Sequence, residues 1–180
     1  MKRAFTLIEL VIVIVVVGIL AAAIIPRTRT NPVSEAAIDL LSKIRYTQHL
    51  AIVDDKYDST NTTWFKNRWQ IAFSANRYSI ISDNNNTYAL DTLDRVTEIK
   101  DVELQGLNAI SLSNDCHGSI ISFDYLGRPL VGSLSATTAS YTSSGSAGQL
   151  LTNTCSIKLT DGSETAFIDI APETGYASIR

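Results

Sequence analysis

Few residues of this chain could carry out chemistry, and they do not form a recognisable catalytic set. The 180-residue sequence holds two cysteines and two histidines. Asp115, Cys116 and His117 are consecutive, but side chains that neighbour one another in sequence seldom face each other as a nucleophile and its base must. Two cysteines with His117 lack a clear fourth ligand for zinc, and His49 fits a surface or partly packed position. We therefore expect no catalytic residue, no metal site and no cofactor.

An oxygen-rich run at residues 83–86 offers a second possible metal site, this time for calcium. In a calcium loop of the EF-hand type, Tyr88 would stand where glycine is needed and Asp94 where glutamate is needed. An exposed turn therefore explains the run better than a calcium loop does.

Aromatic and basic residues alternate near Trp64. Two interpretations fit this run, in which Trp64, Phe65 and Trp69 are interleaved with Lys66 and Arg68. It could contact a polymer, or it could cover the junction between a helix and a sheet. The second interpretation is favoured because large aromatic side chains are most often well buried.

The strongest signal lies at the start of the chain. Residues 5–25 carry a single formal charge, at Glu9, and residues 10–25 are all apolar or glycine. A helix of this length spans about 30 Å, the thickness of a bilayer core. A buried core helix and a cleavable secretory signal are alternatives, since Lys2 and Arg3 precede the run and residues 21–23 are alanines. Glu9 and the length of the run argue against a secretory signal.

Glu9 needs a cationic partner, because a carboxylate in hydrocarbon costs about 2.5–3.5 kcal/mol. The nearby cations are Lys2, Arg3 and any amine that cleavage creates, so the N-terminus itself is the candidate partner. Residues 4–10, Ala-Phe-Thr-Leu-Ile-Glu-Leu, resemble the type III signal of type IV prepilins and pseudopilins. The resemblance implies that a prepilin peptidase, a membrane aspartyl enzyme, cuts between Ala4 and Phe5 and methylates the Phe5 amine. Glu9 would then neutralise that amine on a neighbouring subunit.

The resemblance extends to two further positions and carries one departure. Gly18 and Pro26 match helix-loosening positions of the family, where poor helix formers let the segment extend inside a filament. Ala4 stands where the family usually has glycine, but it is also small.

Removal of residues 1–4 would leave 13 basic and 18 acidic side chains, a net charge of −5 instead of −3. That charge argues against a general nucleic-acid-binding surface.

Topology follows from the resemblance, because charge alone is balanced. Lys2 and Arg3 precede the apolar run, and Arg27 and Arg29 follow it. The resemblance implies a single pass through the inner membrane with the C-terminal domain periplasmic or extracellular. The expected partners are prepilin peptidase, other pilin or pseudopilin subunits and the inner membrane, and no nucleic acid.

The rest of the chain predicts an α+β fold of the pilin type. We expect a leader at residues 1–4, a transmembrane and assembly helix at 5–26, a joint and amphipathic helix at 27–53, and a β-rich extracytoplasmic domain at 54–180. In the third part, apolar residues recur on one face of residues 34–53, which predicts an amphipathic helix. The resemblance to pilins implies that this helix continues from the membrane helix and packs on antiparallel sheet. Strands are predicted at residues 69–73, 78–82, 109–112, 119–125, 155–159, 165–170 and 176–179.

Two features of this domain carry further expectations. Outside the cytoplasm, Cys116 and Cys155 favour a disulfide over two free thiols, with about 4 kcal/mol from closing their loop. Residues 133–153 are rich in Ser, Thr, Ala and Gly, and they predict a long mobile loop that buries little apolar surface.

Residues 45–48 together with 172–176 give the chain a layout similar to pseudopilin H of type II secretion. The leading hypothesis is therefore a non-enzymatic minor pilin or pseudopilin. The alternative is a membrane-anchored binding module for adhesion, DNA uptake or secreted-substrate recognition, using residues 133–153 or 64–69.

Overall fold

The computed structural model describes residues 6–24, 31–82, 87–143 and 147–180. The chain divides into two compact units, residues 1–31 and residues 32–180, and each is described by itself. In the first unit, α1 (Leu7–Ile24) is an α-helix of 18 residues. Across the described residues, no helix combines the length and the apolar character needed to cross a membrane.

Helix α2 (Pro32–Val53) is the spine of the second unit, which we call the head. Pro32 is its first residue, where the missing N–H of proline costs no helical hydrogen bond. The buried side chains recur every three or four residues and so form one stripe: Val33, Ala36, Ala37, Leu40, Ile44, Thr47 and Ala51. This stripe is the amphipathic face that the sequence predicts, and the helix packs through it onto both sheets of the head.

The first sheet has seven strands in the order β3-β2-β1-β6-β7-β8, with β4 also paired to β2. Its strands are β1 (Gln70–Ser74), β2 (Arg77–Ser82), β3 (Thr87–Tyr88), β4 (Val102–Glu103), β6 (Ile120–Phe123), β7 (Pro129–Val131) and β8 (Gln149–Leu150). All of its pairings are antiparallel. Strands β1 and β2 form the predicted hairpin, with Ser74 paired to Arg77 and only two residues between them.

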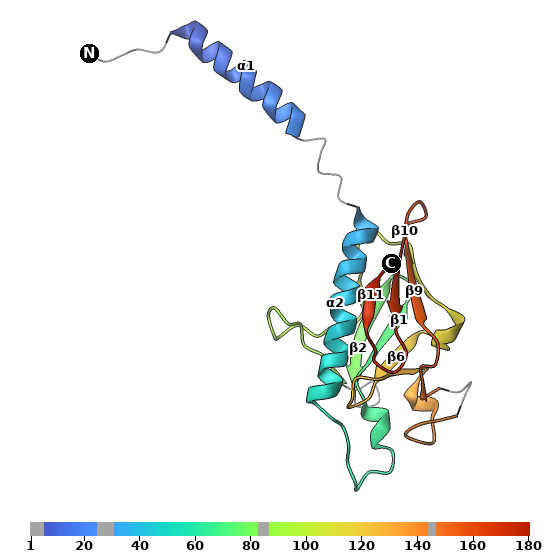
Figure 1. Ribbon diagram of the computed structural model, residues 1–180. Helices are drawn as coiled ribbons and strands as arrows, with labels where there is room; N and C mark the ends of the chain where they lie inside the picture. The colour runs from blue at the N-terminus through green and yellow to red at the C-terminus, as the bar shows by residue number, and fades with distance from the viewer. Residues whose placement is uncertain (1–5, 25–30, 83–86, 144–146) are drawn as a thin grey trace. The chain divides into compact units, whose positions relative to one another are not determined.

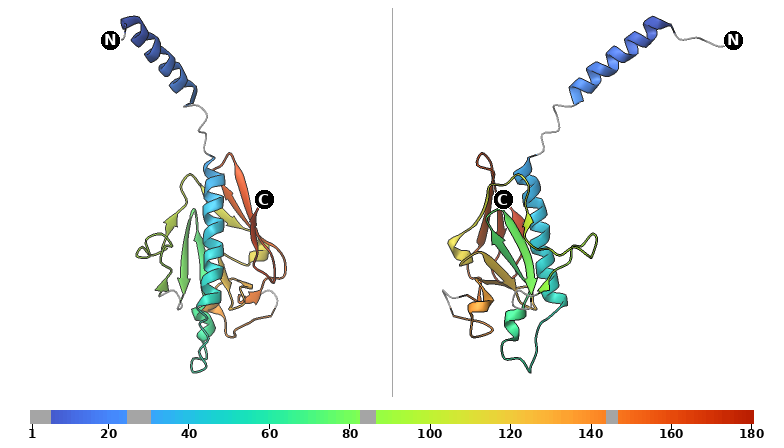
Figure 2. Two further views of the ribbon diagram at one scale, coloured as in Figure 1. Left: turned by 60° about the vertical axis from the view of Figure 1, so that its left-hand side comes forward. Right: turned by 180° about the vertical axis from the view of Figure 1, so that it is seen from behind.

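The second sheet has four antiparallel strands in the order β11-β10-β9-β5. Its strands are β5 (Ala109–Leu112), β9 (Cys155–Thr160), β10 (Thr165–Ile170) and β11 (Ala177–Ile179). Figure 2 (left) shows α2 running in front of the two sheets, with the green strands of the first sheet to one side of it and the red strands of the second to the other. The coarse prediction of a helix followed by antiparallel sheet is confirmed, with two sheets in place of one.

The main core lies where α2 meets the inner faces of both sheets. The side chains of this core alternate along each strand, as in Ile71 and Phe73 of β1 or Ile157 and Leu159 of β9. The outward residues of β9 are polar or charged: Ser156, Lys158 and Thr160. Strand β9 therefore has one packed side and one solvated side.

The first sheet is covered on its outer face as well, and this corrects one prediction. Two short 3-10 helices, η2 (Trp64–Asn67) and η5 (Leu134–Ala136), contact each other there. Leu134 is fully buried, and so is Leu130 of β7, which packs outside the main core. The expectation that residues 133–153 bury little apolar surface is wrong at two positions, since Leu151 is buried in the main core and Leu134 is buried on the outer face of the first sheet.

Candidate assembly site

The first turn of α1 holds the carboxylate that the sequence singles out. The backbone N–H groups of Glu9 and Leu10 donate to the carbonyl of Thr6, at 3.1 and 3.2 Å. The Glu9 N–H also lies 3.4 Å from the Thr6 hydroxyl. Thr6 and Glu9 thus have the spacing of a capping box, in which a Thr caps the helix three residues before a Glu or Gln. The cap places the exposed Glu9 side chain at the positive end of the helix dipole.

The rest of α1 is apolar around its whole circumference. Its large apolar side chains are all strongly exposed within this unit: Leu7, Ile8, Leu10, Val11, Ile12, Val13, Ile14, Val15, Val16, Val17, Ile19 and Leu20. A helix that is apolar on every side is stable only with apolar surroundings on every side. The apolar surface of α1 therefore needs lipid or other protein around it.

The remaining residues predicted for processing and assembly fall in different parts of the chain. Gly18 lies in α1, and a Cβ added at that position would meet no atom within 4 Å. Ala4, Phe5 and Pro26 lie outside the described residues. Glu9 and Gly18 are therefore the two predicted assembly residues whose surroundings are known.

Cys116 and Cys155 form a disulfide, with their Cα atoms 5.0 Å apart. Cys116 ends η4 (Asn114–Cys116), which follows β5, and Cys155 begins β9. Both cysteines are buried in the main core. The bond therefore ties the start of β9 to the segment that follows its neighbouring strand.

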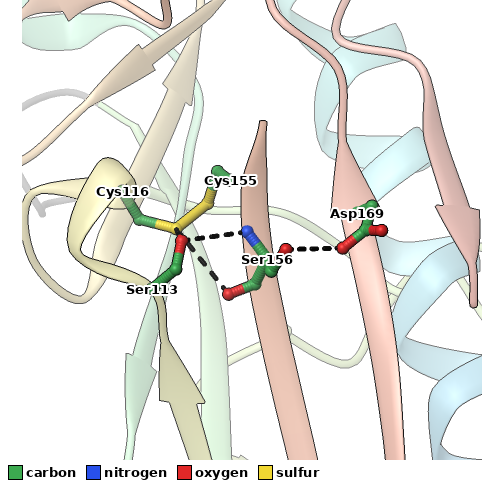
Figure 3. The surroundings of a disulfide bond; sticks show 5 residues. All are labelled: Ser113, Cys116, Cys155, Ser156 and Asp169. Carbon is green, nitrogen blue, oxygen red and sulfur yellow. Dashed lines mark hydrogen bonds between the residues drawn. A yellow bond between two sulfur atoms is a disulfide. The ribbon is translucent and has the colours of Figure 1, made fainter. Parts of the chain in front are cut away.

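Polar contacts surround this bond (Figure 3). The Ser113 hydroxyl lies 3.4 Å from the Cys116 sulfur, and it must be the donor because a disulfide sulfur carries no hydrogen. The same hydroxyl accepts the Ser156 N–H at 3.1 Å, and the Ser156 hydroxyl donates to Asp169 at 2.6 Å. These bonds connect η4, β9 and β10, so the local geometry does not depend on the disulfide alone.

Within the described part of the chain, the other candidates lie on a turn and on the exposed face of a helix. His117 has a left-handed backbone (φ 48°) where η4 ends, which makes the Asp115–His117 run a turn. His49 is exposed on α2. Within residues 6–24, 31–82, 87–143 and 147–180, no three His, Cys, Asp or Glu side chains are grouped to hold a metal ion. The possible calcium run at residues 83–86 lies outside the described residues.

The aromatic run near Trp64 mainly covers the first sheet. Phe65 and Trp69 are buried, and the Trp69 indole N–H donates to Asp54 at 2.9 Å. Arg68 is buried too, and its guanidinium lies 4.9 Å from the Trp64 ring centroid. The structure thus supports the packing interpretation of these residues over a polymer-contact patch.

A charged cluster that the sequence analysis did not find joins this run to residues 133–153. The Arg68 guanidinium lies 4.6 Å from the Tyr141 ring and donates to the Ser140 carbonyl at 2.7 Å. The Tyr141 hydroxyl donates to the buried carboxylate of Asp124 at 3.1 Å, and the Arg128 guanidinium donates to the same carboxylate at 2.8 Å. Burial lowers the pKa of Arg68, and the hydrogen bond to Asp124 raises the pKa of Arg128. The sequence signal for this cluster was the mixture of aromatic and basic residues near Trp64, and that mixture does not reveal that Arg68 contacts Ser140 and Tyr141.

Comparison with known proteins assigns the N-terminal segment. Residues 1–25 match the prokaryotic N-terminal methylation motif, which is the signal of type IV pilins and pseudopilins. The chain thus carries a pilin-type signal, and that signal implies processing by prepilin peptidase, a membrane-anchored N-terminus and assembly with other pilin subunits. It suggests a structural subunit and not an enzyme. No curated protein and no solved structure matches the chain.

Proposed function

We propose that this chain is a minor pilin or pseudopilin, a structural subunit of a type II secretion or type IV pilus-like filament. The observation that carries the proposal is the methylation motif at residues 1–25, which covers the capped start of a helix that is apolar except for Glu9. In this proposal residues 1–4 are the leader and residues 5–26 cross the inner membrane once. Residues 27–53 continue the spine, and residues 54–180 complete a periplasmic or extracellular head.

The finer assignment to a pseudopilin H-like subunit is supported by a contact between the two segments that carry the resemblance. The Gln48 amide donates to the Thr174 carbonyl at 2.9 Å and to the Gly127 carbonyl at 2.8 Å. The Arg45 guanidinium lies 5.9 Å from the Tyr176 ring and donates to the Ala177 carbonyl at 2.9 Å. Residues 45–48 and 172–176 therefore form one packed junction at the edge of α2, as expected if they are features of one layout.

Assembly in this proposal depends on the charge of Glu9. Its carboxylate is the one formal charge in residues 5–25, where an unpaired charge is unfavourable. A neighbouring subunit, after cleavage, would offer the methylated amine of Phe5 as the counter-charge. In surroundings of low dielectric constant, such a pair favours one docking register over others.

Processing is tested by mass spectrometry of the protein from its native membrane. We expect a mature chain that begins at Phe5 and carries one added methyl group. An intact Met1, or a start after Ala23, would contradict the assignment of the leader.

The role of Glu9 is tested by Glu9→Gln. Glutamine at this position keeps the capping box with Thr6, so the substitution removes the charge and leaves the helix start intact. The variant should accumulate, be cleaved and reach the membrane, yet fail to crosslink to other pilin-type subunits. Glu35→Gln is the matched control, because Glu35 is an exposed acid in the first turn of α2.

Normal assembly of Glu9→Gln would refute this role. A membrane-anchored binding module for adhesion, DNA uptake or secreted-substrate recognition would then be the better description. The same result from both Glu9→Gln and Glu35→Gln would show that the effect is not specific to Glu9.

A further inference from the structure

Strand β5 is an open edge of the second sheet. It is the terminal strand in the order β11-β10-β9-β5, and its residues, Ala-Ile-Ser-Leu, include no charge and no proline. Its four residues pair with four consecutive residues of β9. Proteins commonly use charged residues, proline or bulges to stop an edge strand from pairing with another chain. These safeguards are missing from Ala109–Leu112, all of which the structure describes.

The other marginal strands of the head are shorter, or a helix covers them. Strands β3, β4 and β8, at the margins of the first sheet, have two residues each. Strand β11 has three residues and packs on α2, where the Arg45 guanidinium donates to the Ala177 carbonyl at 2.9 Å. With four residues, β5 is the longest of the marginal strands that the structure describes.

Backbone hydrogen bonds show which groups of β5 face outward. The Ser113 N–H donates to the Ser156 carbonyl of β9 at 2.8 Å. In an antiparallel pair every second residue bonds the same neighbour, so Ile110 and Leu112 point their N–H and carbonyl groups to the outer edge. The Ile110 N–H donates to the Ala75 carbonyl at 2.8 Å, whereas Leu112 makes no backbone hydrogen bond to any described residue outside its ladder. The outward backbone of Leu112 can therefore pair with an added strand.

A hollow of about 440 Å³ adjoins this edge. Its lining includes buried or half-buried apolar residues and exposed polar ones: Phe73, Ile110 and Leu112, and then Asn114, His117 and Ser119. Of the described residues that line it, none is an acid, a lysine or an arginine. The hollow thus offers an apolar surface beside the open backbone, and no counter-charge for a strongly charged ligand.

Both walls of the hollow are held in place. Residues 113–117 follow β5, and Figure 3 shows the bond between Cys116 and Cys155 joining this segment to the start of β9. On the other side, the Phe73 N–H donates to the Ser119 carbonyl at 2.8 Å. A surface that is already ordered loses little conformational entropy when it binds a partner.

The open backbone and the hollow together define the ligand. An added strand is bound through main-chain hydrogen bonds, and pockets beside the edge select every second side chain. Side chains on the same face as Ile110 and Leu112 would enter the hollow, and the intervening ones would face solvent as Ser111 does. We propose that β5 binds an extended peptide segment of another protein, in which every second side chain is apolar.

The packing of β5 itself argues against a second copy as the occupant. Ile110 and Leu112 already pack against the main core of their own head. The β5 strand of a second copy therefore has no unpacked apolar side chain to place in the hollow. The segment that binds must bring apolar side chains that are not packed in a domain of their own.

Hydrogen exchange at single backbone N–H groups tests the pairing. The full chain in detergent is mixed with four acetylated seven-residue peptides, in which threonine alternates with valine, leucine, isoleucine or phenylalanine. At least one peptide should slow exchange of the Leu112 N–H by about tenfold or more, because the new hydrogen bond protects it. The Ile110 N–H, which is already bonded to Ala75, is the internal reference and should change little. No protection of Leu112 by any of the four peptides would overturn the proposal.

A backbone control separates strand addition from simple apolar contact. The peptide that binds is made in two N-methylated versions, each with methyl groups on alternate residues, so that each blocks one edge and keeps every side chain. The version blocked on the edge that faces β5 should bind about tenfold more weakly or worse, since it loses its donors. The other version should bind as the unmodified peptide does. Equal binding by the two versions would overturn the proposal.

Two variants of the full chain test the hollow. Ser119→Trp fills it and should weaken peptide binding by about tenfold or more. Ser111→Trp is the matched control, because Ser111 is also exposed but lies on the opposite face of β5, and it should leave binding unchanged. The same affinity in both variants would contradict the assignment of the hollow.

Two further outcomes separate this site from assembly. Protection of Leu112 that rises with protein concentration in the absence of peptide would show that a second copy occupies the edge, and it would overturn the proposal. The lining residues all belong to the head, so Glu9→Gln should bind the same peptides as the unmodified chain. Failure of the proposed function would therefore leave this inference standing.

Discussion

Removing the disulfide between Cys116 and Cys155 should lower the free energy of unfolding of the head by about 4 kcal/mol. The two cysteines are 39 residues apart in sequence. In the chain-entropy model, closing a loop of this length destabilises the unfolded state by about 4 kcal/mol at 25 °C. The hydrogen bonds that join Ser113, Ser156 and Asp169 remain after reduction. The folded state should therefore keep its geometry, so most of the effect falls on the unfolded state.

Urea unfolding of the full chain in detergent, with and without a phosphine reductant, provides the assay. Trp64 and Trp69 are the two tryptophans of the chain, and both lie in the head, so their fluorescence reports its unfolding. With a urea slope of about 2 kcal/mol per molar, the midpoint should fall by about 2 M on reduction. The double variant Cys116→Ser with Cys155→Ser should behave like the reduced protein.

A matched control separates the covalent link from other contacts between the same segments. The Asn153 side chain donates to the Asp115 carboxylate at 3.1 Å, and this hydrogen bond is exposed. Asn153→Ala should change the free energy of unfolding by less than about 1 kcal/mol. A loss below about 1 kcal/mol on reduction, equal to that of Asn153→Ala, would refute the loop-closure reasoning.

Two further predictions concern α2 and the loop after β3. Leu40 is fully buried on α2, so Leu40→Ala should lower the free energy of unfolding by about 2–5 kcal/mol. Ile38 is exposed on the same helix, so Ile38→Ala should change it by less than about 0.5 kcal/mol. The urea midpoints of the two variants measure both effects. Hydrogen bonds from the Thr97 hydroxyl and then from the Val96 N–H lower the pKa of Asp94 to about 2. Because the folded pKa lies below the unfolded value, this carboxylate stabilises the loop above about pH 4 and loses that effect as the pH falls through 2. The amide NMR signal of Val96 should thus stay in place down to about pH 3, and a transition near pH 4 would contradict the assignment.

Local patterns were enough to predict the parts of the head that alternate regularly. The apolar stripe of α2 follows from its helical repeat, and β10 begins and ends at the residues predicted for it. The hairpin of β1 and β2 was also predicted, although Ala75 in its turn has a φ of 53° that glycine or asparagine would adopt more readily. In this hairpin the pairing of two good strands outweighs an unfavourable turn residue.

The shortest strands of the first sheet could not be predicted, because two or three residues are too few to show an alternation of apolar and polar side chains. Strand β7 has three residues and begins with proline, which argues against a strand when only the sequence is known. Strand β8 has two residues and lies in a segment rich in serine, threonine and glycine. Strand β7 forms because it pairs with the edge of β6, and β8 forms because it pairs with the edge of β7. Such pairing depends on neighbours in space, which composition does not reveal.

The outer layer of the first sheet could not be predicted from the sequence for the same reason. Nothing within residues 133–153 indicates burial, since the segment has few large apolar side chains. Ile81 and Leu130 on the sheet are apolar and point away from the main core, so this face needs a cover. Leu134 supplies part of that cover, and Arg68 holds the segment in place through Ser140. The reason for the fold of this segment therefore lies in a sheet face formed by distant residues.

The processing segment and the loop after β3 differ for a related physical reason. A processing enzyme acts on a contiguous stretch of chain, so the roles proposed for Ala4, Phe5 and Glu9 could be predicted from neighbouring residues in the sequence. Leu93 and Val96 stand in an acidic stretch that gives no such sign. They become a projecting pair only because Ala89 and Ile99 anchor the base of the loop in the head. The signal proposed to admit the chain to an assembly is therefore local in sequence, whereas the exposure of Leu93 and Val96 is a product of the fold.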